Sequence, residues 1–480
     1  MKNSTLYILI FIFLANGCTD DFEEINTNPN SPISVQSSLL LRQVLYDYGE
    51  EMSYEGFVAG NLLGQHFTMV DFNLFDRHDL SSPQLGGNPW PSLYTNLRDN
   101  ELLLEQSRAN PISAVYEGPA LILKAYITAA LTDIYGDVPY LEAAQGKSNG
   151  IVNPGYDAQS DIYQAAGGIL DNLDQGLAAI ENYTGTQALD GDIILGGDLS
   201  RWIRLANSLK IKYLMRISEV VEVADALETI YANDSYIQKS TDNATFDFLA
   251  TQPNTFRLAI LRAGDFNLYV LSETMQEIFS ELNDPRVGVL FRPASNSAGV
   301  FRGLLNGPDA SNTSISVADF SLTGTIFREN SQLLEANFMT NWETLFLLAE
   351  AAEKNLIQAN ASALYNQGVA EAFDYWQTEL PPGYLTSGRA AYESDGQNPV
   401  EQIITQKWIA NSINGYEGWI EYRRTGFPNL KTVSASLNND LIPVRMPYPA
   451  EEAALNSHNY QAAILDNQNS VNSRVWWDVD

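Results

Sequence analysis

The chain has 480 residues, with 27 Lys and Arg against 59 Asp and Glu, so its formal net charge is −32. Phosphate binding needs an excess of basic side chains, and this charge therefore argues against nucleic acid as a partner. Hydrophobic residues make up 45% of the chain and aromatic residues 11%, which excludes a disordered protein. The only cysteine, Cys18, excludes an intrachain disulfide, a thiolate metal site and an iron–sulfur cluster.

The N-terminus has the pattern of a secretion signal. Lys2 precedes an apolar run from Leu6 to Leu14, which is too short to span the ~30 Å hydrocarbon core of a bilayer. Small or turn-forming residues then lead to Cys18, as at the lipidation site of bacterial lipoproteins. We predict a signal peptide over 1–17 and lipidation of the cysteine. The alternative is an ordinary secretory signal followed by an incidental cysteine.

Residues 18–34 have the composition of a flexible tether. The acidic run TDDFEE is followed by Asn, Pro and Ser, and such a segment buries too little apolar surface to fold. The acidic start resembles the surface-export signal of lipoproteins in Bacteroidetes. Acyl chains on the cysteine would hold the protein at a membrane. No later segment has the ~18 apolar residues of a membrane-spanning helix.

Residues 35–480 are dominated by helical periodicity, and we expect them to form a single domain. Over 118–135 the apolar side chains recur every three or four residues, which places them on one face of a helix that ends near Gly136. Similar patterns indicate an all-α fold, with further helices at 35–50, 92–107, 158–181, 222–231, 269–281 and 399–413.

Two more helices have recognisable start signals. Ser200 is predicted to cap a helix over 201–218. Thr340 and Glu343 have the spacing of a capping box before a helix over 341–354.

The helix over 341–354 is followed closely by another over 362–378, and this pair suggests a helical hairpin of the tetratricopeptide kind. Strand signals are few. Short strand pairs are expected around 299–303 and 442–446. Long loops in compact proteins often carry function. Three segments rich in Asn, Gly, Ser and Pro are predicted to form such loops, at 235–257, 283–335 and 379–400.

Known catalytic and nucleotide-binding motifs are absent from the sequence, including GxSxG, HExxH, the P-loop and GxGxxG. The histidines His66, His78 and His458 lie far apart, so we predict neither a metal site nor a cofactor. The 59 acidic residues make chance carboxylate pairs inevitable, and counting them does not identify a glycosidase. We predict that the protein is not an enzyme; a surface glycosidase is the alternative of a different class.

Short blocks spread over the chain carry a family resemblance. The strongest is IITQKWIANSINGYEGWIEYRRTGFPNL at 403–430. Further blocks include DDFEEINTNPNSP at 20–32, WPSLYTNLRDNELLLE at 90–105, TAALTDIYGDVPYLEA at 128–143, WIRLANSLKIKYLMRIS at 202–218 and WETLFLLAEAAEK at 342–354. In this order, and behind a lipoprotein signal, they resemble the SusD/RagB family of outer-membrane nutrient-binding lipoproteins of Bacteroidetes.

The resemblance implies both a fold and a role. The fold is an α-superhelix of about four tetratricopeptide-like helix pairs, with an irregular, loop-rich half and minor short β-hairpins. The role is that of a cell-surface lipoprotein of the outer membrane. It would capture glycan oligosaccharides and pass them, as a hinged lid, to a SusC-like TonB-dependent transporter. Some relatives serve peptide importers, so a peptide ligand is the alternative within the family.

A sugar ligand stacks its C–H face on an aromatic ring, while a few polar side chains bind its hydroxyls. Aromatic and polar residues interleave in two irregular segments, at 67–90 and 264–302. The candidate ligand-binding residues are Phe72, Phe75, Asp76, Arg77, Asn88 and Trp90 in the first segment, and Phe266, Tyr269 and Phe291 in the second. For each ring, ordinary loop packing is the alternative.

Starch-binding relatives form part of their site just before the block that matches WxxLY, which favours the first segment by position. We expect that replacing Phe72, Phe75 and Trp90 together by Ala abolishes ligand retention without unfolding the chain. The tryptophans in helix-forming blocks are instead expected in the core: Trp202, Trp342, Trp376, Trp408 and Trp419.

The block EGWIEYRRTG places Arg423 and Arg424 beside Glu417 and Glu421. One interpretation is a site for a carboxylated ligand. The expected one is a set of paired charges that fixes this C-terminal helix against the superhelix. Glu350, bordered by apolar residues, is then the buried partner that a buried arginine requires.

Overall fold

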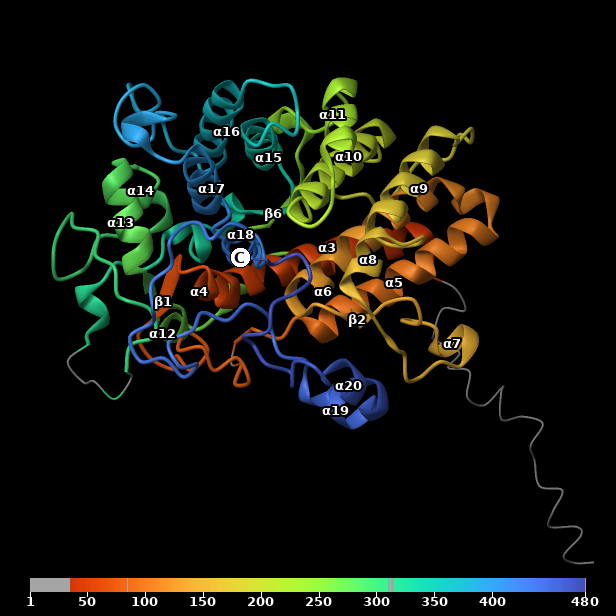
Figure 1. Cartoon of the computed structure of the whole chain (residues 1–480), viewed down its shortest axis with the longest axis horizontal. Helices are drawn as coiled ribbons and strands as arrows, with labels where there is room; N and C mark the ends of the chain where they lie inside the picture. The colour runs from red at the N-terminus through yellow and green to blue at the C-terminus, as the bar shows by residue number, and fades with distance from the viewer. Residues whose placement is uncertain (1–34, 84, 310, 312–314, 480) are drawn as a thin grey trace, which may run out of the picture.

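The computed structural model describes residues 35–479 apart from 84, 310 and 312–314. The predicted signal peptide (1–17) and the tether (18–34) with Cys18 lie outside these residues. Figure 1 shows longer helices side by side across the upper part of the molecule, with loops and short elements to the left and below. Within the described ranges, none of the helices has the length and apolar character needed to cross a membrane.

The longer helices pack in pairs and form the predicted superhelix. They span Ser37–Glu55 (α3), Trp90–Ala109 (α5), Glu117–Tyr135 (α6), Ile169–Glu181 (α9), Leu199–Arg216 (α10), Ala224–Asn233 (α11), Asn341–Glu353 (α15) and Ala361–Tyr375 (α16). α3 packs against α5, α6 against α9, α10 against α11 and α15 against α16. The array is continuous, because α10 also contacts α9 and α15. The all-α tetratricopeptide-like prediction is confirmed.

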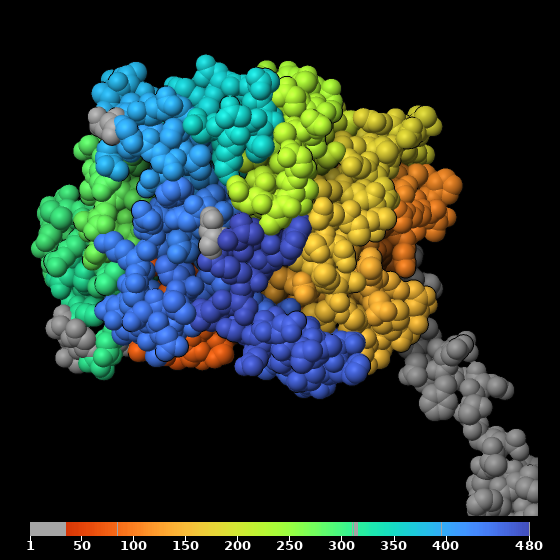
Figure 2. Space-filling model, viewed as in Figure 1, coloured from red at the N-terminus to blue at the C-terminus, as the bar shows by residue number. Residues whose placement is uncertain are grey.

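Shorter helices complete the fold. They are α4 (Asn61–Leu63), α7 (Gly146–Asn149), α8 (Gln159–Gln164), α12 (Ala263–Phe266), α13 (Glu273–Leu282), α14 (Val287–Leu290), α17 (Pro399–Ala410), α18 (Glu417–Thr425), α19 (Ala450–Leu455) and α20 (Ser457–Ala463). α3 continues directly into a π-helical turn, η1 (Gly56–Gly60). The blue C-terminal segments cover much of the face seen in Figure 2.

The strands of the described chain form two-stranded antiparallel ladders. They are β1 (Phe67–Met69), β2 (Val138–Pro139), β3 (Tyr156–Asp157), β4 (Ala244–Asp247), β5 (Tyr269–Leu271) and β6 (Glu335–Met339). β1 pairs with β5, β2 with β3, and β4 with β6. The prediction of strands at 299–303 and 442–446 is wrong, since both segments run as irregular backbone. Two of the ladders join segments distant in sequence, which local alternation of side chains does not reveal.

Local signals explain where several helices differ from prediction. The helix expected over 158–181 is divided into α8 and α9 at Gly167, whose φ of 79° only glycine adopts readily. The segment 269–281 begins as strand β5, and α13 starts only after Ser272, whose hydroxyl accepts from the Met275 amide at 2.9 Å. Gly136 ends α6 with φ 82°, as predicted.

The cap at Thr340 is confirmed, because its hydroxyl accepts from the Glu343 amide. The Glu343 carboxylate does not complete a capping box, since it lies 2.9 Å from Lys212 Nζ. The predicted cap at Ser200 is wrong. Asp198 caps α10 instead, accepting from the Ser200 amide at 2.8 Å, and its negative charge suits a helix N-terminus.

Aromatic side chains dominate the interior. The tryptophans expected in the core are all buried: Trp202, Trp342, Trp376, Trp408 and Trp419. A second, smaller cluster gathers around α15 and α16 and contains Trp342, Phe346 and Tyr365. The expectation of one domain over 35–480 stays a prediction.

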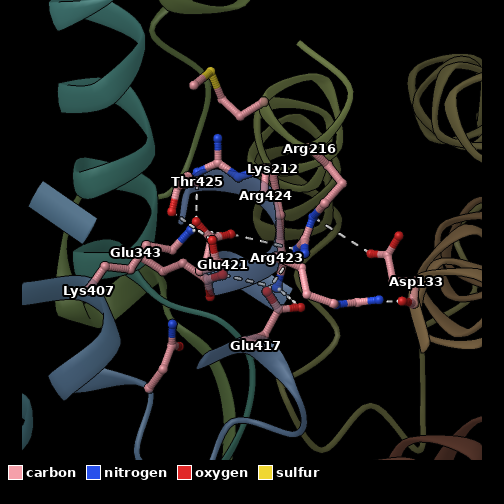
Figure 3. A network of polar contacts seen from close by, with 12 residues as sticks. Asp133, Lys212, Arg216, Glu343, Lys407, Glu417, Glu421, Arg423, Arg424 and Thr425 are labelled. Atoms are coloured by element: carbon pink, nitrogen blue, oxygen red, sulfur yellow. Dashed lines mark hydrogen bonds and ion pairs between the residues drawn. The ribbon is translucent and has the colours of Figure 1, made fainter. Parts of the chain in front are cut away.

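A buried network of charges joins the superhelix to α18 (Figure 3). Its members come from α6, α10, α15, α17 and α18. They are Asp133, Lys212, Arg216, Glu343, Glu350, Lys407, Glu417, Glu421, Arg423 and Arg424. The carboxylates and the cations balance in number. Every member except Arg423 lies within 4.0 Å of an opposite charge. In a low-dielectric interior an unpaired ion would be very costly.

Arg424 is the centre of one half of this network. Its guanidinium contacts both oxygens of Glu350 at 2.7 and 2.6 Å, and Glu421 at 2.7 Å. The predicted role of Glu350 as buried partner is thereby confirmed. Arg423 instead donates to the backbone carbonyl of Val444 at 2.8 Å, and its guanidinium lies 3.9 Å from the centre of the Trp419 ring. Both arginines are buried, so neither is open to a carboxylated ligand.

Removing one member of the Arg424 pair should be strongly destabilising. We expect Glu350→Ala to lower the free energy of unfolding by about 3–5 kcal/mol, because it leaves the Arg424 charge buried and incompletely paired. Glu117→Ala breaks a half-exposed pair with Arg108 (2.8 Å) and should cost about 1 kcal/mol or less. Denaturant unfolding of both variants measures the difference, and equal losses would contradict the assigned role of the network.

Acid should weaken the fold through the same network. Burial by itself raises the pKa of Glu417, but the charges of Arg216 and Lys212 bring it down to about 2 from an ordinary 4.5. The stabilisation is therefore complete above pH 4.5 and is lost as the pH falls through about 2. The loss from this one group is about 3 kcal/mol.

We expect the free energy of unfolding to fall between about pH 5 and pH 2.5, and to fall less steeply in the Glu417→Gln variant. Urea titrations across this range measure it. A wild-type protein with constant stability over the window would contradict the expectation.

Candidate ligand-binding surface

The two segments predicted to bind ligand lie side by side. β1, in the first segment, pairs with β5, in the second, with Thr68 opposite Val270. The fold thus brings together two candidate segments that are about 200 positions apart and that the sequence offered separately.

Most of the candidate rings face inward, however. Phe75 and Trp90 are 5% and 7% exposed, and Phe266, Tyr269 and Phe291 are 1% exposed. Phe266 and Tyr269 stack around Phe57, with ring centres 5.6 and 5.0 Å away. These side chains form the aromatic base beneath the loop between β1 and α5. Their packing is the alternative that the sequence left open for each ring.

Phe72 is the candidate ring that faces solvent, with 62% of its surface exposed. Its backbone has φ 48°, a region that bulky side chains rarely enter. Such strained residues persist only where the surroundings hold them, and they concentrate at functional sites. An exposed aromatic ring offers the apolar face of a sugar a surface on which to stack.

Asp76 fixes the loop that carries Phe72. The carboxylate is buried and accepts from the Thr68 hydroxyl at 2.7 Å, the Asn306 amide group at 2.7 Å and the Gly307 backbone N–H at 2.8 Å. Burial raises the pKa of Asp76, while these hydrogen bonds oppose the rise. Asp76 is therefore a positioning residue whose oxygens are already occupied by protein donors.

Polar side chains follow Phe72 in the loop, and the segment around residue 308 contacts this loop. Arg77 is half-buried and donates from Nε to the Ala435 carbonyl at 2.7 Å. Asp309 is exposed, and hydrogen bonds from Ser311 together with the charge of Arg77 lower the pKa of its carboxyl. Asn73 links the loop that carries Phe72 to the segment that carries Asp309, because its amide group donates to the Pro308 carbonyl at 2.7 Å. Sequence reasoning missed Asp309, since nothing local links it to a loop more than 200 residues away.

The far end of the same loop is held by Glu55 at the end of α3. The Gly87 N–H donates to the Glu55 carboxylate at 2.8 Å, and the Tyr416 hydroxyl donates to it as well. Burial raises the pKa of Glu55 to about 7, and the two hydrogen bonds oppose the rise. Asn88 follows directly and is half-buried. The loop is thus fixed at both ends, with Phe72 exposed between them. We call Phe72, Leu74, Arg77 and Asp309 the Phe72 surface.

The side chains of His66 and His78 are buried and contact backbone carbonyl groups. Burial lowers the pKa of His66 and of His78 to about 4. His66 contacts the Trp408 carbonyl at 2.7 Å, and His78 contacts the Leu441 carbonyl at 3.1 Å. Among the described residues, no group of three or more His, Cys, Asp or Glu side chains is placed to hold a metal ion.

The exposed Phe72 ring is the candidate contact of this surface with a ligand. A family model for SusD-like proteins, described as "Starch-binding associating with outer membrane", matches residues 29–449. The match covers most of the chain, so the chain belongs to the SusD-like family. It is a nutrient-binding protein associated with the outer membrane.

Solved structures share the fold. A SusD homologue from Bacteroides fragilis is 23% identical, with a TM-score of 0.78 over 93% of this chain and 99% of that one. A second homologue from the same species is 22% identical, with a TM-score of 0.80 over 93% and 100%. A chitin-binding SusD homologue from Flavobacterium johnsoniae is 21% identical, with a TM-score of 0.77 over 92% and 98%. A comparison with curated proteins gave no match.

The burial pattern changes the expectation for alanine variants. The triple replacement of Phe72, Phe75 and Trp90 should not leave the fold intact, because two of these rings are in the core. We expect Phe75→Ala alone to cost about 3–5 kcal/mol of stability. Phe72→Ala should keep the unfolding midpoint and weaken glycan binding by about 1–3 kcal/mol, the order found for stacking on an aromatic ring. Thermal unfolding and calorimetric titration separate the two effects.

Proposed function

We propose that this protein is a cell-surface lipoprotein that captures glycan oligosaccharides. It passes them to a partner SusC-like TonB-dependent outer-membrane transporter, over which it acts as a lid. The observation that carries the proposal is Phe72, an exposed ring held on a loop whose two ends are fixed by Asp76 and Glu55. Membership of the SusD-like family supports it.

The sequence of the N-terminus supports the anchor. Cys18 follows an apolar signal and precedes an acidic, Asn- and Pro-rich tether over 18–34. A lipidated end would keep the domain over 35–480 at the membrane while leaving it free to rotate over a transporter.

The chemistry of the site supports binding without catalysis. A glycosidase needs a carboxylic acid with a raised pKa that reaches the glycosidic oxygen. Burial raises the pKa of Glu55 and Asp76, yet both are enclosed by protein donors. Their role is to hold the loop.

The glycan assignment is tested by calorimetric titration of the full-length lipoprotein, in detergent, against a panel of neutral oligosaccharides. The transporter assignment is tested by affinity purification from detergent-solubilised outer membranes, where a TonB-dependent transporter should co-purify. A protein that binds peptides and no glycan would overturn the glycan assignment in favour of a peptide importer.

The anchor is tested by Cys18→Ser, which removes the thiol that would be acylated. We expect the wild-type protein in the outer-membrane fraction and the variant in the soluble fraction. Thr19→Ser, which keeps the cysteine, is the matched control and should remain in the membrane. Equal membrane retention of all three proteins would contradict lipidation at this position.

A further inference from the structure

A polar groove lies between α13 and α17, which are neighbours at the left of Figure 1. It encloses about 230 Å³. The α13 wall presents Glu277, Ile278 and Glu281. Glu281 is four residues after Glu277 and three after Ile278, and residues at these spacings lie on the same face of a helix. The α17 wall presents Glu401 and Thr405, again four residues apart. None of these side chains belongs to the Phe72 surface.

Basic side chains already neutralise the α13 wall. Arg389, from the loop after α16, lies 3.2 Å from Glu281. Lys431, from the segment after α18, lies 2.6 Å from Glu277. The Lys431 backbone is itself fixed, since its N–H donates to Gln65 Oε1 at 2.9 Å. This wall is therefore formed by paired, partly exposed charges.

The opposite wall keeps polar groups that the protein does not use. The side chains of Glu401, Thr405 and Asn429 make no hydrogen bond to any residue in the described part of the chain. Gln402 beneath them is buried and is held by the Ala391 carbonyl at 3.0 Å. Unused acceptors and donors above a rigid floor are what a concave site offers to the hydroxyls of a ligand.

The groove is also within reach of the Phe72 surface. Lys431 lines the groove, and four residues later the Ala435 carbonyl accepts from Arg77. Four residues span at most about 14 Å. An oligosaccharide of several units is long enough to contact both places.

We propose that the groove between α13 and α17 is a second carbohydrate subsite, in which Glu401, Thr405 and Asn429 bind the hydroxyls of a neutral oligosaccharide. The inference rests on the proposed function and names its ligand class. The carboxylate of Glu401 has no cation paired with it, so it would repel the acidic groups of uronic-acid or sulfated glycans. The subsite thus favours neutral oligosaccharides over acidic ones. It also extends the area that contacts the ligand beyond the Phe72 surface.

The test is calorimetric titration of the full-length lipoprotein with the tightest-binding neutral oligosaccharide of the panel. Glu401→Ala removes a charged hydrogen-bond partner and should weaken binding about tenfold or more. Thr405→Trp fills the groove and should weaken it at least as much. Glu181→Ala, at the exposed end of α9, is the matched control and should bind as the wild type does.

The outcomes separate the two proposals. If Phe72→Ala weakens binding and both groove variants bind normally, the second subsite is overturned while the proposed function stands. If the wild-type protein binds no glycan, the proposed function fails and the subsite with it. Should Thr405→Trp fold poorly, Glu401→Ala decides alone, because the Glu401 side chain makes no hydrogen bond within the described chain. Normal binding by that variant overturns the subsite.

Discussion

The buried charges around α18 are the constraint on which the architecture depends. Ions in a low-dielectric interior must be paired, and α10, α15 and α17 each place a charge against an opposite charge of α18. Asp133 of α6 is paired with Arg216 of α10. Replacing the whole network by apolar residues could leave stability unchanged, but it would remove this geometric requirement. The network therefore acts mainly on specificity: it selects one arrangement of the superhelix relative to the C-terminal segments that cover it.

The segment before α18 is connected to the Phe72 surface by hydrogen bonds. Tyr416 immediately precedes α18 and donates to Glu55, which also accepts from Gly87 in the loop that carries Phe72. Next to Glu55 the π-helical turn packs closely on the chain before α18. A Cβ on Gly60 would lie only 2.0 Å from the Gly415 carbonyl oxygen, so the contact requires glycine. The packing of the interior thus positions the loop that carries the exposed Phe72 ring.

Helices and caps were predictable because they depend on neighbours in sequence. The stripe over 118–135, the glycine after it and the Thr340 cap were all found from local patterns. The candidate site was less predictable. Phe72 and Phe75 have equivalent sequence contexts in one irregular segment, yet Phe72 is exposed and Phe75 is buried. Asp309 and the α13–α17 groove were missed entirely, since their residues come from segments that only folding brings together.

The sequence by itself determined the helical class, the family and the acidic net charge, and it predicted Glu350 as a buried partner for the arginine pair Arg423 and Arg424. Each of these rests on periodicity, composition or recognisable blocks. The tertiary structure decided which aromatic rings are core and which one faces the solvent, and it decided the strand pairs. It also gave Asp76 its role, because its carboxylate accepts from nearby Thr68 and from the distant residues Asn306 and Gly307. The physical reason is that burial and long-range hydrogen bonds depend on the whole packed chain, whereas local patterns report only the neighbours of each residue.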